Sequence, residues 1–270
     1  MEKRRMCPHC RAFITTSDKV CPYCDTPVGP KAIDLRSPGD LLGGLIPGGQ
    51  FVTVVILTAN VGLFLVTMLA SAKMGEMAAL TLYGAARPDM VFAGQWWRLI
   101  TAGFLHGGFM HILFNSWALM DVGRHAEEIY GARRMVVIYL LSTVGGFLAS
   151  MFWTRSVSVG ASAGLFGLIG AMITVGILHR GSYEAAAIKE FYIRWAVYGL
   201  LWGLLPFFRV DNAAHVGGLV TGFLTAWVTG TPRKFSVVKE QFWGVVCWVL
   251  VALTAYAFLQ MFLWNRSVVG

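Results

Sequence analysis

Residues 160–178 read GASAGLFGLIGAMITVGIL, an apolar run long enough to cross a lipid bilayer, and Ser162 lies near its start. The stretch 212–218, NAAHVGG, opens another apolar segment and places His215 inside it. An ionisable side chain in a membrane-spanning segment is energetically costly and is by default a functional candidate. A serine with a histidine is also the smallest set of groups for nucleophilic acyl transfer. The pair suggests a protease that works inside the bilayer.

The composition indicates a polytopic membrane protein. The 270 residues are 56% hydrophobic and 13% charged, and the mean hydropathy is +0.62. A soluble domain usually has about 25% charged residues. The net charge of +8 does not indicate a nucleic-acid partner, because the basic residues are spread over loops. In loops they report membrane orientation.

Windows of about 20 apolar residues predict seven membrane-spanning helices and therefore an all-α fold. The predicted spans are 51–70, 107–122, 135–153, 160–178, 192–208, 213–230 and 242–264. With the N-terminus in the cytoplasm, 16 of the 22 Lys and Arg residues fall in inside segments. This asymmetry places the C-terminus outside. No apolar core of a signal peptide follows the basic N-terminus, and with the compact loops this favours a bacterial plasma membrane.

Two pairs of cysteines near the N-terminus predict a metal site. Cys7-Pro8-His9-Cys10 and Cys21-Pro22-Tyr23-Cys24 are separated by ten residues. Two such turns offer four thiolates to one tetrahedral zinc ion, which leaves no open position for catalysis and makes the site structural. A disulfide is disfavoured in the reducing cytoplasm. The fifth cysteine, Cys247, is expected to be a small packing residue.

Four polar residues are expected at one depth below the outer surface. Ser162 and His215 each follow an external loop closely, and His111 lies about one turn into the second span. Asn115 is four residues after His111, so these two share a helix face. The agreement in depth favours a common site. The alternatives are a serine bonded to its own helix carbonyls, and a histidine and an asparagine that only join helices.

The expected chemistry is acyl transfer by a dyad. Repeated glycines in the fourth and sixth spans allow these helices to approach closely. His215 would take the proton of Ser162 and return it to the leaving amine. The oxyanion needs donors aimed at it, and His111, the Asn115 amide and the Ser162 backbone N–H are the natural set. Asp211 is a candidate third catalytic residue that would orient His215, but nothing in the sequence supports this role.

The stretch 72–105 is too long for a tight turn and too mixed in composition for a span. It contains Trp96-Trp97-Arg98, an aromatic and cationic cluster. Such clusters often lie at the lipid headgroups, and a plain interfacial anchor is one interpretation.

Residues 92–230 resemble the rhomboid family of intramembrane serine proteases. The resemblance depends on motifs in one order, namely Trp97-Arg98, His106, His111-Ile112-Leu113-Phe114-Asn115, Gly160-Ala161-Ser162, and Ala214-His215 with Gly217-Gly218. It implies a six-helix core at 51–230. The cysteine pairs, the composition and the apolar runs predict three further sections outside that core, namely a zinc ribbon at 1–28, a glycine- and proline-rich linker at 29–50, and a cytoplasmic loop with a seventh helix at 231–270.

The resemblance also implies residue roles. Ser162 is then the nucleophile and His215 the base, with His111 and Asn115 lining the oxyanion hole. Phe166 matches an aromatic residue that stacks on the catalytic histidine, and Glu127 matches a structural acid. Trp97 and Arg98 match an external loop that is partly embedded in the membrane. The fifth span matches a lateral gate, and the substrates implied are single-span membrane proteins. No cofactor is needed for this catalysis.

One departure from the family pattern follows the serine, where Ala163 stands in place of the usual glycine and its methyl group could narrow the oxyanion region. The main alternative function is a catalytically inactive rhomboid-like protein that binds membrane clients. A small transporter with a proton path of histidines and a zinc-ribbon adaptor with anchoring spans are further alternatives. The sequence does not identify a partner of the ribbon.

Overall fold

The computed structural model describes residues 4–7, 9–15, 17–28, 50–179, 181–204, 210–231 and 237–269. The chain forms two compact units, residues 1–45 and 46–270. Of the predicted linker at 29–50, all residues except Gln50 lie outside the described ones.

The N-terminal unit is built on a small antiparallel sheet. Strand β1, Arg4–Met6, pairs with strand β2, Phe13–Thr15, so that Met6 lies opposite Phe13. Cys7, Ile14 and Cys21 are buried together. So few buried residues cannot stabilise a fold of this size, which therefore needs a metal or a cross-link.

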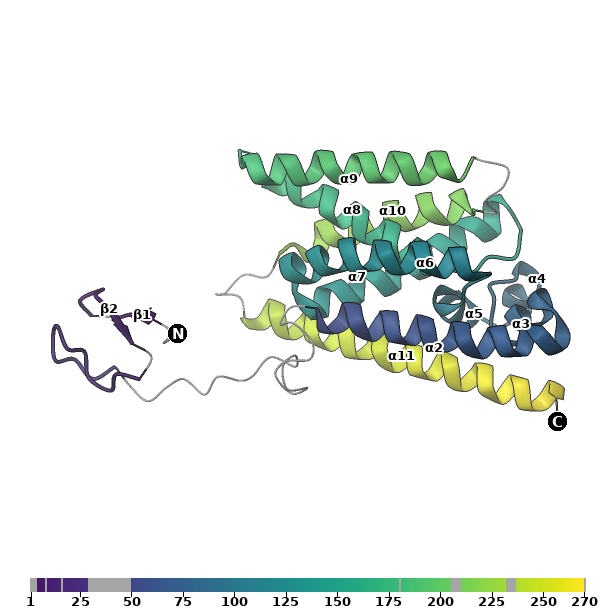
Figure 1. Ribbon diagram of the computed structural model, residues 1–270, viewed down its shortest axis with the longest axis horizontal. Helices are drawn as coiled ribbons and strands as arrows, with labels where there is room; N and C mark the ends of the chain where they lie inside the picture. The colour runs from purple at the N-terminus through teal and green to yellow at the C-terminus, as the bar shows by residue number, and fades with distance from the viewer. Residues whose placement is uncertain are drawn as a thin grey trace. The chain divides into compact units, whose positions relative to one another are not determined.

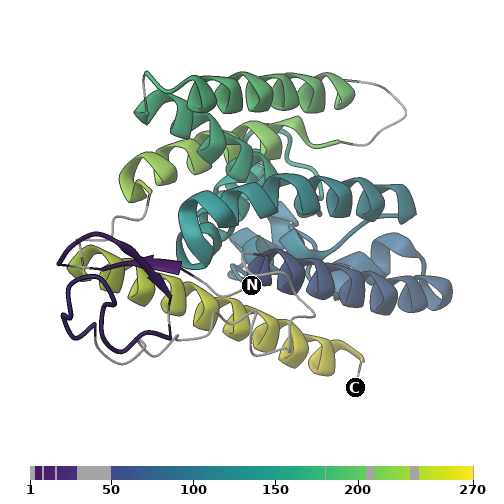
Figure 2. The same ribbon diagram turned by 60° about the vertical axis from the view of Figure 1, so that its left-hand side comes forward.

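The second unit is helical (Figure 1). Its elements are α2 (Phe51–Met74), α3 (Glu76–Leu82), α4 (Pro88–Phe92), α5 (Arg98–Thr101), the 3-10 helix η1 (Ala102–Phe104), α6 (Phe109–Ala118), the π-helix η2 (Leu119–Gly123), α7 (Arg124–Trp153), α8 (Ser162–Leu178), α9 (Tyr183–Trp202), α10 (Asn212–Thr229) and α11 (Val237–Val269). The long helices lie side by side, with α9 at one edge and α2 and α11 at the other (Figures 1 and 2). The short helices α3, α4 and α5 gather at one end of the bundle (Figure 1).

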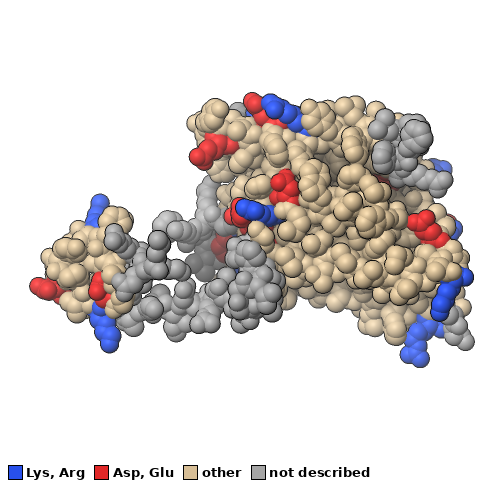
Figure 3. Space-filling view, viewed as in Figure 1, with Lys and Arg blue, Asp and Glu red and all other residues tan. Residues whose placement is uncertain are grey.

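Among the described residues, three helical stretches are long and apolar enough to cross a membrane, namely Phe51–Met74, Phe109–Trp153 and Val238–Val268. The second stretch is broken at Gly131, whose φ of 74° lies in the left-handed region that favours glycine. It therefore supplies the second and third predicted spans. Helix α8 is a shorter apolar helix. On the face shown in Figure 3, charged side chains of this unit lie toward its two ends, as expected for a bundle surrounded by lipid.

Helices α9 and α10 are present, but neither is among the helices apolar enough to cross a membrane. Helix α9 begins nine residues before the predicted fifth span, at Tyr183, because its first turns contain charged residues that a hydropathy window excludes. The last residues of that predicted span, 205–208, lie outside the described ones. A count of seven spans therefore stays a prediction.

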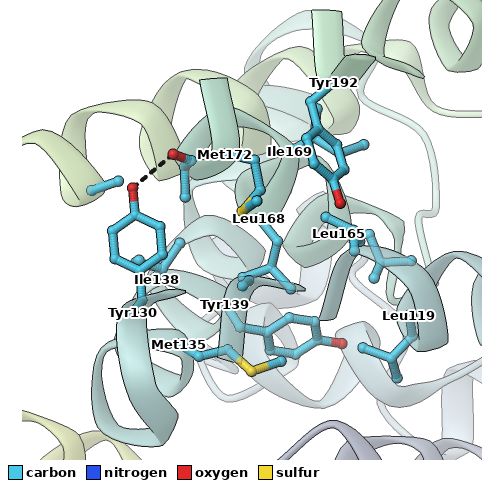
Figure 4. Packing of buried hydrophobic residues seen from close by; sticks show 14 of the residues in the cluster. Leu119, Tyr130, Met135, Ile138, Tyr139, Leu165, Leu168, Ile169, Met172 and Tyr192 are labelled. Atoms are coloured by element: carbon cyan, nitrogen blue, oxygen red, sulfur yellow. Dashed lines mark hydrogen bonds between the residues drawn. The ribbon is translucent and has the colours of Figure 1, made fainter. Parts of the chain in front are cut away.

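The core lies where α7 and α8 meet their neighbours (Figure 4). Leu168 and Met172 on α8 pack with Met135 and Ile138 on α7. The hydroxyl of Tyr130 donates a hydrogen bond of 2.7 Å to the Ala171 carbonyl, drawn as a dashed line in Figure 4. Because lipid tails are as apolar as these side chains, close packing and such hydrogen bonds hold the helices together.

Glu127 caps the start of α2 from another helix. Its carboxylate accepts hydrogen bonds of 2.9 Å from the backbone N–H groups of Val52 and Thr53 and from the Thr53 hydroxyl. The first N–H groups of a helix have no intrahelical partner. A negative charge at this N-terminal end is also attracted to the positive end of the helix dipole. Glu127 is thus a structural acid at the contact of α7 with α2.

Candidate active site

The site is built on the crossing of α8 and α10, where the two backbones touch. A Cβ on Gly218 would overlap the carbonyl oxygen of Ala163, and one on Gly222 would overlap that of Gly167. Glycines at these positions remove the side chains that would separate the helices. The repeated glycines of the fourth and sixth predicted spans therefore allow α8 and α10 to approach closely, as the sequence indicated.

Ser162 and His215 lie on the facing sides of this crossing. Ser162 is the first residue of α8, and Phe166 is one turn further along the same face. The Phe166 ring stacks on His215, with ring centroids 4.1 Å apart and planes inclined by 14°. His215 is 6% exposed, whereas Ser162 is partly exposed. A buried imidazole thus lies beside the face of the more accessible hydroxyl.

In the described part of the chain, no hydrogen bond joins Ser162 to His215, and His215 Nδ1 has no partner. Catalytic hydrogen bonds are often long without substrate and shorten when it binds. Asp211 does not serve His215 here, because its carboxylate accepts hydrogen bonds from the Ala214 N–H at 3.0 Å and from the Ser150 hydroxyl. Asp211 therefore caps α10 and ties it to α7.

His111 and Asn115 approach the backbone just before Ser162. Gly160 has a φ of 126°, and a Cβ on it would lie 2.6 Å from His111 Nε2 and 3.6 Å from the Asn115 amide nitrogen. The Gly107 N–H donates to His111 Nδ1 at 3.3 Å. Nδ1 is therefore an acceptor, and the neutral ring carries its proton on Nε2, toward Gly160.

The Asn115 side chain is a donor without an acceptor. Its amide nitrogen is buried and has no hydrogen-bond partner, although buried polar groups are normally paired. The N–H of Ser162 is also in the first turn of α8, where intrahelical acceptors are absent. His111 Nε2 and the Asn115 amide nitrogen thus both lie beside Gly160, two residues before Ser162.

The methyl group of Ala163 does not point into this space. It lies against α7, because a Cβ on Gly146 would be 2.7 Å from the Ala163 Cβ. Gly146 leaves room for that methyl group at the junction of α7, α8 and α10. The expected narrowing of the oxyanion region is thus not found. The methyl group of Ala163, the departure from the family pattern, instead takes part in the packing of α8 on α7.

Several residues of the site were missed from the sequence. Gly146 accommodates Ala163 and Ala214, Ser150 donates to Asp211, and the Tyr139 ring fills the space over Gly164. All three lie on α7, whose face toward the site is apolar or small. The available signal was Gly145-Gly146 followed by Ser150 at helical spacing, a small-residue face within a predicted span.

Trp97 and Arg98 are buried by protein, so the interpretation as a headgroup anchor is wrong for both. Trp97 is 4% and Arg98 0% exposed. The Arg98 guanidinium donates to the carbonyls of Thr81 at 2.8 Å and Ala85 at 3.1 Å and to the Gln95 side chain at 2.7 Å. It organises the external segment between α2 and α6.

The four cysteines of the N-terminal unit are arranged for one tetrahedral ion. All four Sγ atoms lie within 4.8 Å of one another, with Cys7 3.7 Å from Cys24 and Cys10 3.6 Å from Cys21. Zinc–sulfur bonds of about 2.3 Å in a tetrahedron place the sulfurs about 3.8 Å apart. Hydrogen bonding with the side chain and backbone of Thr26 lowers the pKa of Cys24 to about 5, which favours the thiolate that zinc binds.

The two cysteine turns have the same backbone. The Arg11 N–H donates to the Cys7 carbonyl and the Asp25 N–H to the Cys21 carbonyl, each at 3.0 Å. Arg11 and Asp25 also have positive φ, 60° and 51°. The residue after each cysteine pair thus turns the chain in the same way, and both turns present their thiols to one point.

Fold and site together define a helical membrane protein in which glycines line the crossing of two helices, α8 with Ser162 in its first turn and α10 with the buried His215. The protein-family model described as the rhomboid domain matches residues 93–232 of this sequence. The chain therefore belongs to the rhomboid family. The matched residues do not include the cysteine ribbon.

Named relatives agree with this membership. Rhomboid protease GluP of Bacillus subtilis (strain 168) is 35% identical over 188 residues, which are 70% of this chain and 36% of that protein. RHOMBOID-like protein 5 of Arabidopsis thaliana is 41% identical over 172 residues, 62% of this chain and 55% of that protein. The aligned regions thus span only about a third to a half of these relatives. Membership and relatives support a function of the intramembrane protease type.

Proposed function

We propose that this chain is an intramembrane serine endopeptidase that cleaves transmembrane-segment substrates with a dyad of Ser162 and His215. The observation that carries the proposal is the helix crossing. At this crossing the ring of Phe166 on α8 stacks on the buried His215 of α10. The partly exposed Ser162 lies one turn before Phe166 on α8. Membership of the rhomboid family supports the same assignment.

In the proposed reaction, neutral His215 takes the proton of Ser162 as Oγ attacks the scissile carbonyl carbon. The C–O bond forms and the carbonyl oxygen becomes an oxyanion, held by His111 Nε2–H, the Asn115 amide and the Ser162 N–H. The C–N bond then breaks, and His215 gives its proton to the leaving amine. Water attacks the acyl ester in the same way, and the released serine regains its proton.

The substrate must enter from the lipid. Carbonyls in a helix are already hydrogen-bonded, so a scissile segment has to leave its helix before it can be attacked. Helix α9 is the proposed lateral gate. It meets α6 through ring pairs, Phe114 with Trp202 at 5.3 Å and Trp117 with Trp195 at 5.1 Å. Contacts between rings can part without breaking backbone hydrogen bonds.

Cleavage of a model single-span substrate in liposomes tests the function. The wild type is expected to cut it, and Ser162→Ala and His215→Ala are expected to reduce cleavage to background while the melting temperature stays close to that of the wild type. A folded wild type that cuts no model substrate would favour the alternative, a catalytically inactive client-binding rhomboid.

The N-terminal unit is proposed to hold one structural zinc ion on Cys7, Cys10, Cys21 and Cys24, a set that the sulfur distances fit. The ion supplies folding energy and no step of catalysis. We further propose a plasma-membrane location, with bacterial origin suggested by the compact loops. The distribution of basic residues supports an orientation with the ribbon in the cytoplasm and the C-terminus outside.

A further inference from the structure

The seventh helix contacts the external segment that leads to the nucleophile. Trp264, near the outer end of α11, lies over the Arg98 guanidinium at 4.7 Å, and Trp97 lies over it at 4.5 Å. The two indole rings are 6.1 Å apart. Arg98 is fully buried, so the charge depends on these ring faces and on its hydrogen bonds.

A second contact of α11 lies next to the first. Phe258 meets Phe104 edge to face at 5.5 Å, and Phe104 follows Ala102 in η1. Trp264 and Phe258 both belong to a cluster with Trp97 and other buried residues of this face. Helix α11 therefore packs on the external segment at two points rather than lying free in lipid.

The external segment is in turn bonded to the backbone before Ser162. Arg98 donates to the Ala85 carbonyl, and the next residue, Ala86, exchanges two backbone hydrogen bonds of 3.0 Å with Ser158. The N–H of Gly160 donates to the Ala102 carbonyl at 3.0 Å. Both routes end within four residues of Ser162.

We propose that α11 positions the nucleophile, with Trp264 as a positioning residue. Its indole holds Arg98 and, through it, the segment that fixes Ser158 and Gly160. Those two residues set the entry of the chain into α8 and the direction of the Ser162 N–H. The inference rests on the proposed function, because what is positioned is the proposed nucleophile.

Two measurements on the full chain in detergent test the proposal. The first is the second-order rate at which a small fluorophosphonate phosphonylates Ser162 with loss of fluoride, a reaction that does not involve substrate docking. The second is hydrogen exchange of the backbone at 158–160. Trp264→Ala is expected to slow phosphonylation about 10- to 10²-fold, the range for a small displacement at a reacting centre, and to speed exchange at Gly160.

Matched variants separate positioning from general packing. Trp264→Phe keeps an aromatic face over Arg98 and is expected to restore most of the rate. Trp248→Ala removes an indole from the same helix at a position that is 69% exposed, and it is expected to leave both readouts unchanged. If Trp264→Ala does not fold, Trp264→Leu decides, because it keeps apolar volume without an aromatic face.

Wild-type rates of phosphonylation and exchange in the Trp264→Ala variant would overturn the proposal and leave the proposed function intact. An equal loss in Trp248→Ala would also overturn it, since any helix contact would then suffice. A wild type that is not phosphonylated would defeat the proposed function. Exchange at 158–160 would then still decide whether α11 fixes this backbone.

Discussion

Asn115 is expected to contribute to catalysis and little to the stability of the folded protein. Its amide nitrogen is buried and unpaired, so the folded protein gains little from it. A donor of this kind is preorganised for charge that exists only in the transition state. His111, with its proton directed to Gly160 by the Gly107 hydrogen bond, has the same character.

Asn115→Ala is expected to lower kcat about 10²- to 10³-fold with little change in KM, as for loss of one oxyanion donor. The melting temperature should stay close to that of the wild type, because no hydrogen bond of the amide nitrogen is lost. Steady-state cleavage and thermal unfolding check both statements. Ser116→Ala, on another face of the same helix, is the control and should leave kcat unchanged. A rise in KM or a loss of stability without a fall in kcat would exclude the role.

The identities of the polar residues could be read from the sequence, and their neighbours could not. Ser162, His215, His111 and Asn115 are conspicuous because polar groups are costly in apolar segments. Gly146, which accommodates Ala163, is one of many glycines in the chain, and its meaning depends on which helix crosses it. The burial of Arg98 was likewise hidden, because its covering ring, Trp264, lies 166 residues later.

At the scale of helices, the crossing of α8 and α10 fixes the geometry of the site. The glycine pattern predicted the crossing, since small residues allow close approach. The start of α9 was missed, because its charged first turns carry no apolar signal. A break between the second and third spans was predicted, but not its position, because glycine within a run of helix formers does not by itself identify a turn; the structure places it at Gly131.

Gly218→Ala tests the crossing. The added methyl group would overlap the Ala163 carbonyl oxygen, so α10 has to move away from α8. We expect cleavage to fall by at least about 10²-fold, since small displacements at a site have such effects, and stability to fall by about 1–3 kcal/mol. Gly62→Ala on α2 is the control, because a Cβ there meets nothing within 4 Å. Full activity in Gly218→Ala would show that the backbones need not touch.

Glu127→Gln tests the cap of α2. The amide cannot accept three hydrogen bonds as the carboxylate does, and its charge is lost, so a loss of about 1.5–3 kcal/mol is expected. Glu128→Gln is the matched control, because Glu128 pairs with Arg124 on the exposed surface, at 3.2 Å, and such pairs contribute about 0–1 kcal/mol. Thermal unfolding in detergent compares the two. Equal melting temperatures for both variants would contradict the capping role.

For the whole molecule, the two units have separate physical bases. The helical unit is held by packing within lipid, and the N-terminal unit by four thiols that converge on one point. The sequence predicted this division because CxxC pairs and apolar runs are distinct patterns. Nothing in either pattern identifies a partner for the ribbon.

Cys7→Ser tests the independence of the units. It is expected to reduce bound zinc from about one equivalent to near zero, since a four-thiolate site loses a ligand. Phosphonylation of Ser162 by the fluorophosphonate should change less than about twofold. Metal analysis of purified protein and labelling rates check this, with Cys247→Ser as a control that removes a thiol from α11 instead. Loss of phosphonylation in folded Cys7→Ser protein would show that the units are coupled.

The central claim is that His215 activates Ser162 at the α8–α10 crossing. Peptide mass spectrometry after fluorophosphonate treatment tests it most directly. The account predicts one phosphonylated residue, Ser162, in the wild type, and none in His215→Ala that keeps the wild-type melting temperature. Modification of another serine, or undiminished modification of Ser162 without His215, would contradict it.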